Sequence, residues 1–162
     1  MEVKRREVQP FSVCGLQVRT CNADEQQADS ARIGPMWERF FVEGLFDSIG
    51  QRQSDSFVYG VYSNYESDAS GHFDVTVGVA VDEGHADYPL VRIEGGEYLA
   101  FSAKGPMPEV VIQTWGLIWA YFEDNPAIRR RYATDFEVYT GADSVSVYIG
   151  VQASDELSRS SN

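Results

Sequence analysis

Residues 136–152, FEVYTGADSVSVYIGVQ, have the pattern of two short strands joined by a turn at residues 140–143. In the second half of this stretch, apolar residues occupy every other position. In the first half, Glu137 stands inside a short apolar and aromatic strand. Because successive side chains of a strand alternate between its faces, we expect Glu137 and Tyr139 to point the same way. Such a carboxylate lies on a wet surface, pairs with a buried arginine, or occupies a pocket that attracts a positive charge.

The composition restricts the classes of function. The chain has 162 residues, which is the length of one domain, and 43% of them are apolar, which is enough for a core. The net charge of −12 argues against a nucleic-acid surface, which needs lysine and arginine against the phosphates, and against an anionic membrane. The same charge either attracts cations or serves solubility alone. No apolar run is long enough to cross a membrane, and the first residues contain no signal-peptide core.

The cysteines and histidines do not predict a metal site or a catalytic triad. Cys14 and Cys21 match no metal or redox spacing, which favours a reduced, cytoplasmic protein. His72 and His85, the two histidines, stand in unrelated contexts. We therefore expect no metal and no cofactor.

Two helices are predicted from apolar residues that recur at three and four positions. The first covers residues 33–49 and is ended by Gly50, and the second covers residues 108–123 and is stopped at residues 125–126, Asn-Pro. The arginine run at 129–131 and the acidic segment at 82–87 are interpreted as solvated loops. Strands are predicted over residues 2–21 (interrupted by Pro10 and Gly15), 57–63, 72–81 and 90–102 (broken at Gly95 and Gly96).

The order strand, helix, strand, strand occurs twice, over about residues 1–82 and 88–153. Trp37 and Trp115 occupy similar places in the two helices, and Gly60 and Glu137 are equivalent in the third segments. This repetition indicates a duplicated unit with pseudo-two-fold symmetry and a groove where the halves meet. We expect a single domain over residues 1–156, followed by a flexible tail at 157–162.

Six segments have an order and a spacing that are specific when they are taken together. They are IGPMWERF at 33–40, YGVY at 59–62, residues 73–81, YLAF at 98–101 leading into KGP at 104–106, the helix around Trp115, and FEVY at 136–139. In these segments the chain resembles the gyrase-inhibitor-like effector-binding domains, which form the ligand-sensing part of some AraC-type and MerR-type regulators. The resemblance covers about residues 2–153 and looks like a stand-alone version, similar to effector-binding proteins carried on integron cassettes.

The resemblance implies an α+β fold of two strand-helix-strand-strand units, with an antiparallel sheet and two helices around a central ligand cleft. Regulators of this family bind amphipathic, often cationic, aromatic drugs there. The family's acidic pocket residue lies in the motif that FEVY matches, so that role carries over to Glu137.

The predicted ligand site places Glu137 at the base of an aromatic cleft, with core packing as the alternative role of each aromatic residue. Tyr59 and Tyr139 are favoured, because a buried hydroxyl needs a polar partner. The full set of candidate wall residues is Trp37, Tyr59, Trp115, Trp119, Tyr139 and Tyr148.

The leading hypothesis is a non-catalytic protein that binds amphipathic cationic aromatic compounds and is coupled to transcription regulation. One alternative is a small-molecule hydrolase in which Glu137 acts as a general base with help from tyrosines. Another is an interaction protein that modulates DNA gyrase or a toxin. Direct binding of nucleic acid and association with membranes are not expected, and a homodimer or a separate regulator protein remain open as partners.

Overall fold

The computed structural model describes residues 2–27, 29–45, 57–67, 71–81, 88–107, 109–141 and 143–152. The expectations for Gly50, the acidic segment at 82–87 and the tail at 157–162 lie outside these ranges. The strands are β1 (Glu2–Val8), β2 (Phe11–Thr20), β3 (Val58–Ser63), β4 (Phe73–Val81), β5 (Leu90–Ile93), β6 (Gly96–Lys104), β7 (Arg130–Gly141) and β8 (Ser144–Val151), and the helices are α1 (Asn22–Glu25), α2 (Ile33–Val42) and α4 (Glu109–Asp124).

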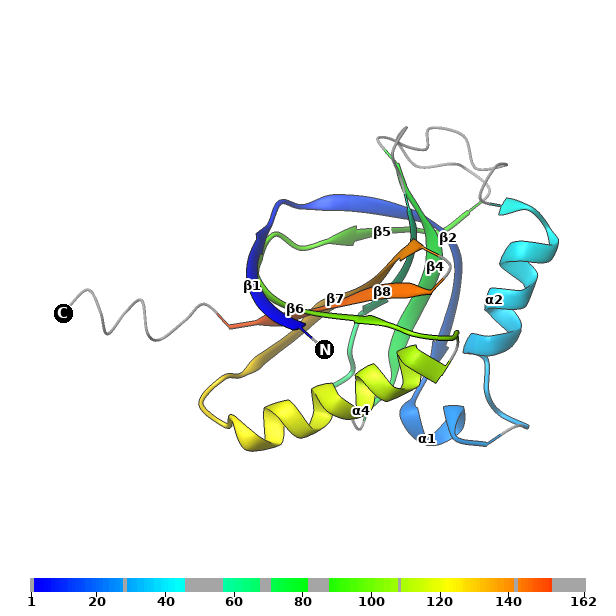
Figure 1. Ribbon diagram of the computed structural model, residues 1–162. Coiled ribbons are helices and arrows are strands. Elements are labelled where there is room, and N and C mark those ends of the chain that lie inside the picture. The colour runs from blue at the N-terminus through cyan, green and yellow to red at the C-terminus, as the bar shows by residue number, and fades with distance from the viewer. Residues whose placement is uncertain are drawn as a thin grey trace.

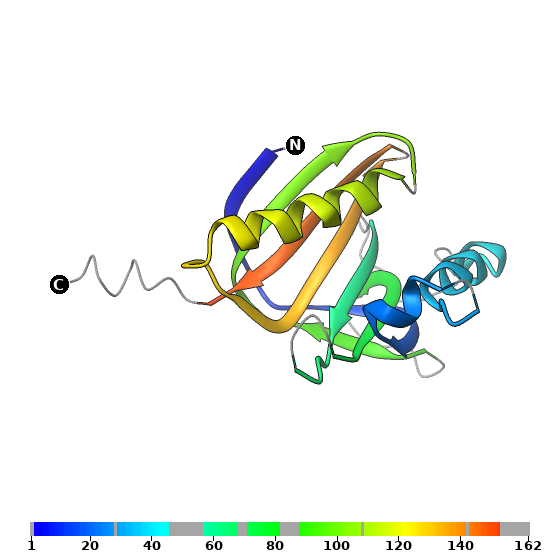
Figure 2. The ribbon, with the colours of Figure 1, turned by 90° about the horizontal axis from the view of Figure 1, so that it is seen from below.

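The described strands form one eight-stranded antiparallel sheet in the order β1-β6-β8-β7-β3-β4-β2-β5. The predicted α+β fold with an antiparallel sheet is thereby confirmed. The sheet is strongly curved, and α2 and α4 lie apart from one another over different parts of it (Figures 1 and 2). Within the described residues, no helix is both long enough and apolar enough to span a membrane.

The strand order is symmetric about the boundary between β7 and β3. On one side lie β7, β8 and β6, which carry α4, and on the other side lie β3, β4 and β2, which carry α2. The outer strands cross over, because β1 pairs with β6 and β5 pairs with β2. At the central boundary Gly60 is the direct partner of Glu137, so the axis that relates the two halves passes through this residue pair.

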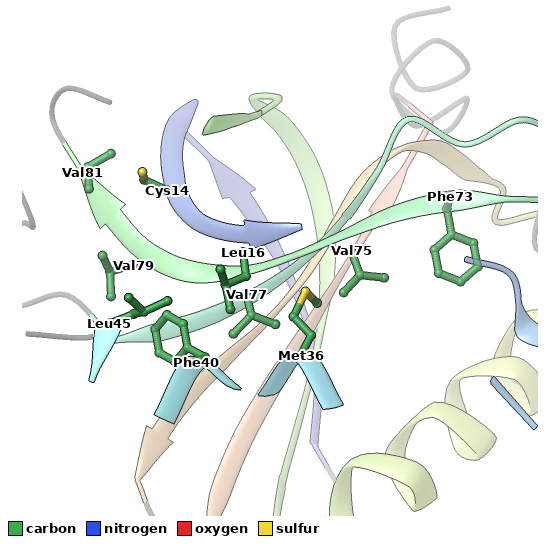
Figure 3. Packing of buried hydrophobic residues seen from close by; sticks show 10 residues of the cluster. All are labelled: Cys14, Leu16, Met36, Phe40, Leu45, Phe73, Val75, Val77, Val79 and Val81. Atoms are coloured by element: carbon green, nitrogen blue, oxygen red, sulfur yellow. The ribbon is translucent and has the colours of Figure 1, made fainter. Parts of the chain in front are cut away.

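Each helix covers its half of the sheet with an apolar stripe. In the first half, Met36 and Phe40 of α2 are buried against the valines of β4, as Figure 3 shows. In the second half, Val110 and Ile118 of α4 are buried against β6 and β8. Burying one such side chain contributes about 1.5–3 kcal/mol, so the two stripes hold the helices in place.

A third cluster lies on the face of the sheet opposite α2 and α4. Phe136 and Glu137 are neighbours on β7 and therefore point to opposite faces. Phe136 is buried with Val61 and Tyr98, and Phe11, Tyr59 and Tyr148 pack around them. The sheet is therefore packed on both faces, and its aromatic residues divide between a helix-covered face and this third cluster.

The structure differs from the sequence-based expectations in three places. The segment at 2–21 forms two strands separated at Pro10, and β2 continues through Gly15. Helix α2 ends at Val42, because Gly44 adopts a left-handed conformation with φ of 64°, which stops a helix. The third difference concerns the arginine run.

The interpretation of the arginine run as a solvated loop is wrong. Arg130 and Arg131 belong to β7, and the Arg130 side chain is 7% exposed. Its guanidinium donates a hydrogen bond of 2.7 Å to the fully buried carboxylate of Asp135. A buried charge persists only when it is paired, and these two residues provide each other's counter-charge.

Candidate ligand-binding pocket

A cavity of about 1060 Å³ lies between α2 and α4, above the boundary between β3 and β7. Trp37 projects into it from α2, and Trp115 and Trp119 project into it from α4. Its base contains Glu137 and Tyr139 of β7. Such a volume is large enough for a drug-sized ligand.

Glu137 is 2% exposed and accepts three hydrogen bonds, all from neutral donors. The Tyr139 hydroxyl donates to Oε1 at 2.6 Å. The Tyr62 hydroxyl donates to Oε2 at 2.8 Å, and the Trp115 indole N–H donates to the same oxygen at 2.7 Å. Within the described residues no lysine or arginine forms an ion pair with this carboxylate.

Burial raises the pKa of Glu137 above its ordinary value, because the charged form is desolvated. The three hydrogen bonds act in the opposite direction and favour the ionised form. Burial and the charge of Glu137 also raise the pKa values of Tyr62 and Tyr139 well above that of an ordinary tyrosine. Both hydroxyls therefore remain protonated and act as donors.

The pseudo-two-fold axis explains why these side chains meet. Tyr62 lies two residues after Gly60, and Tyr139 lies two residues after Glu137, so the two tyrosines are related by the axis. One glutamate on the axis thus receives a hydrogen bond from a tyrosine of each half.

Gly60 leaves room for the carboxylate. A Cβ atom at this position would lie 3.0 Å from Glu137 Oε1 and 3.4 Å from the Cζ2 atom of Trp37. The first contact is tight, and the carboxylate would have to shift by a few tenths of an ångström to accept it. Glycine on β3 avoids this crowding beside the buried carboxylate on β7.

The mouth of the pocket is apolar and exposed. Phe41 of α2 is 61% exposed, and Ile112 and Trp119 of α4 are 68% and 46% exposed, although all three line the cavity. Exposed apolar groups gathered at one opening are typical of a surface that binds an apolar partner or ligand.

The structure brings five of the seven predicted site residues to this pocket. Tyr59 and Tyr148 are the exceptions and do not line this cavity. Both pack in the third cluster on the opposite face, where Tyr148 is stacked on Phe136 with ring centres 4.6 Å apart. The five residues that line the pocket are Trp37, Trp115, Trp119, Glu137 and Tyr139.

Sequence reasoning missed Tyr62, although the repeat contains a signal for it. In the alignment of the halves Tyr62 matches Tyr139, and the structure gives both the same bond to Glu137. Tyr65, which also lines the pocket, was missed as well. Its hydroxyl donates to Asp135, the partner of Arg130.

The charges that line the pocket differ in how they are compensated. Arg130 is paired with Asp135. Glu25 accepts hydrogen bonds from the backbone N–H groups of Arg32 and Ile33, at the start of α2. Glu137 is thus the lining carboxylate that is both buried at the base and held by neutral side chains alone.

Comparison with known proteins identifies relatives of this architecture. A family model described as integron-associated effector binding protein, Cass2, matches residues 6–151. A solved integron cassette protein from Vibrio cholerae is 37% identical, with a TM-score of 0.80 over 93% of this chain and 95% of that chain.

Two further relatives are more distant. A solved protein in complex with tetraphenylphosphonium is 19% identical, with a TM-score of 0.77 over 94% of this chain and 95% of that chain. YobU of Bacillus subtilis, whose name makes it a candidate transcriptional regulator, is 28% identical over 129 aligned positions, and the match covers 77% of this chain and 78% of YobU.

Proposed function

The chain belongs to the family of integron-associated effector-binding proteins, and on that premise we propose that it binds lipophilic aromatic cations in the pocket between α2 and α4. Glu137 supplies the counter-charge at the base of the pocket, and the binding involves no chemical step.

The observation that carries this proposal is the buried carboxylate of Glu137, held by Tyr62, Tyr139 and Trp115. An ionised carboxylate in an apolar pocket is costly, because it has lost most of its hydration. A cation on the ligand compensates for this lost hydration by a direct electrostatic attraction to the carboxylate, so no lysine or arginine of the protein is needed for that purpose. Because three donors already occupy most of the carboxylate's hydrogen-bonding positions, a delocalised cation fits better than an ammonium group, which needs several acceptors of its own.

The pocket walls suit the same ligands. The faces of Trp37, Trp115 and Trp119 attract a cation by roughly 0.5–2 kcal/mol each. The apolar surface buried on binding adds about 25 cal/mol for each Å². Neither contribution is strongly directional, so we expect broad specificity for flat or propeller-shaped cations.

The comparisons support this proposal at a coarser level. The relative in complex with tetraphenylphosphonium is only 19% identical, so its likeness establishes a common fold, and we extend the ligand class to this chain as part of the proposal. The similarity to YobU supports a place in transcriptional regulation. A net charge of −12 disfavours direct contact with DNA, so the chain would influence transcription through a separate regulator protein.

Two ions of matched shape and opposite charge test the proposal. Tetraphenylphosphonium and tetraphenylborate are titrated into the protein by calorimetry, with mass spectrometry of the recovered ligand. Saturable binding of the phosphonium, at least tenfold tighter than that of the borate, with unchanged ligand mass, is the expected result. Equal affinity for the two ions would contradict a cation site.

A further inference from the structure

Three side chains of metal-binding chemistry meet at the end of β2, outside the cation pocket. Cys21 directly follows β2, Asp24 lies in α1, and His72 directly precedes β4. The thiol sulfur, one carboxylate oxygen and one ring nitrogen all lie within 4.8 Å of one another. Cys21 is 9% exposed, whereas half of the His72 side chain is open to solvent.

Cys21 is buried at the start of α1. It is the residue that caps the start of α1, a position where serine, threonine, aspartate or asparagine usually accepts a backbone hydrogen bond. The Cys21 side chain makes no such bond. Three positions later, Asp24 lies on the same side of the turn, so the thiol and the carboxylate share one face.

The ligand set and its spacing fit zinc. Zinc binds cysteine sulfur at about 2.3 Å and histidine nitrogen or carboxylate oxygen at about 2.0–2.2 Å in a tetrahedron, which places ligand atoms roughly 3.3–3.7 Å apart. The observed limit of 4.8 Å is wider by roughly 1 Å. Asp24 is partly buried and His72 is exposed, so a bound ion would close this difference by rotation of these two side chains.

A second carboxylate orients the His72 ring. Glu66 Oε1 lies 3.5 Å from Nδ1 of His72 and also accepts the backbone N–H of His72 at 3.2 Å. Metal-binding histidines usually donate one ring N–H to a carboxylate, which leaves the other nitrogen for the metal. Glu66 lies in that position beside Nδ1, which would leave Nε2 for the metal.

We propose that Cys21, Asp24 and His72 bind a divalent transition metal, zinc in the first place, with a fourth position for water. Thiolate, imidazole and carboxylate together suit zinc better than magnesium or calcium, which prefer oxygen ligands alone. The bound metal ties α1 to the start of β4. Glu25 of α1 and Phe73 of β4 line the cation pocket, so the metal braces one wall of it. The metal site does not depend on the identity of the ligand in the pocket.

Cobalt(II) is the probe, because a cobalt–thiolate bond gives a charge-transfer absorption band that other ligands do not give. The reduced full-length protein is titrated with Co²⁺, and bound cobalt is then displaced with Zn²⁺. Cys21→Ala and His72→Gln are the test variants. Cys14→Ala is the matched control, because Cys14 is the other cysteine, is fully buried and lies in the core under α2.

The wild type and Cys14→Ala are expected to show the band at one equivalent of cobalt and to lose it with zinc. Cys21→Ala is expected to lack the band, and His72→Gln to bind cobalt at least tenfold more weakly. His72 is half exposed, so His72→Gln remains folded and is the decisive variant. Zinc is also expected to raise the melting temperature of the wild type but not that of His72→Gln. Absence of the band in the wild type, a band that depends on Cys14, or equal affinities in all variants would overturn the proposal.

Discussion

Replacing Glu137 by glutamine removes the charge at the base of the pocket and preserves its shape. The glutamine carbonyl oxygen replaces Oε2 and accepts from Tyr62 and Trp115. The amide group replaces Oε1 and donates to the Tyr139 hydroxyl, which turns from donor to acceptor. All three neighbours remain hydrogen-bonded, so the change in ligand affinity reports the charge alone.

The expected loss follows from Coulomb's law. A delocalised cation seated above the carboxylate has its charge centre about 6 Å away, and an effective dielectric constant of about 20 gives an attraction of about 2.8 kcal/mol. The amide dipole of glutamine retains part of it. We therefore expect the affinity for tetraphenylphosphonium to fall between tenfold and a hundredfold, which is about 1.4–2.8 kcal/mol.

The assay is quenching of tryptophan fluorescence, because Trp37, Trp115 and Trp119 all line the pocket, with calorimetry as an independent measurement. Tyr59→Phe is the matched control, since it removes a hydroxyl from the opposite face of the sheet and is expected to leave the affinity unchanged. The thermal stability of Glu137→Gln is expected to equal or exceed that of the wild type, because a desolvated charge is removed. A stable Glu137→Gln protein that binds the cation as tightly as the wild type would refute the role of the charge.

Four further predictions concern the charge of Glu137, its neighbour Gly60 and the buried pair of Arg130 and Asp135. Burial raises the pKa of Glu137, so a proton competes with the cation for the carboxylate. The cation affinity of the wild type is expected to fall as the pH is lowered through that raised value. The affinity of Glu137→Gln, measured by calorimetry, is expected to stay constant across the same range. The stability of the ligand-free protein is expected to change in the opposite direction with pH. Because folding raises the pKa of Glu137, its protonation stabilises the folded state, and this contribution is present at low pH and lost as the pH rises through the raised value. Denaturant titrations of the wild type and Glu137→Gln measure this difference. Gly60→Ala is expected to cost about 1–3 kcal/mol in unfolding free energy and to weaken cation binding, since the new Cβ contacts the carboxylate; unchanged binding would contradict the close approach. Asp135→Ala leaves Arg130 buried without its counter-charge and is expected to cost about 3–5 kcal/mol in a urea titration, against less than about 1 kcal/mol for Glu43→Ala, which breaks an exposed pair.

The sequence predicted most of the strands and helices, and it led to the proposal of Glu137 as the centre of the site. Alternation predicted the two hairpins, and helical periodicity predicted α2 and α4, because each helix has one apolar stripe that packs on the sheet. The strand pattern singled out Glu137 as unusual, and the family resemblance supplied its expected role in the pocket. The repeat predicted that Gly60 and Glu137 are equivalent, and the structure adds that they are direct partners in the sheet.

The errors arose for residues whose position depends on the direction of the side chain or on contacts between distant segments. Tyr59 is adjacent to Gly60 on β3, so strand alternation already placed it on the face opposite Glu137. Arg130 was interpreted as part of a solvated loop because the segment that contains it has no alternating apolar pattern. The pairing of β7 with β8 is irregular between Arg130 and its partner Asp135. The cluster of Cys21 and His72 could not be predicted from spacing, since it depends on the contact between the start of α1 and the start of β4.

The pairing of Gly60 with Glu137 also bears on how such a site can arise. If each half were a separate chain in a symmetric dimer, both positions would carry the same residue. Two glutamates would face each other and share a proton, and two glycines would leave no charge. A single anion on a two-fold axis therefore requires two halves that differ at this position. A duplicated unit within one chain meets that requirement, because one half carries the glycine and the other the acid.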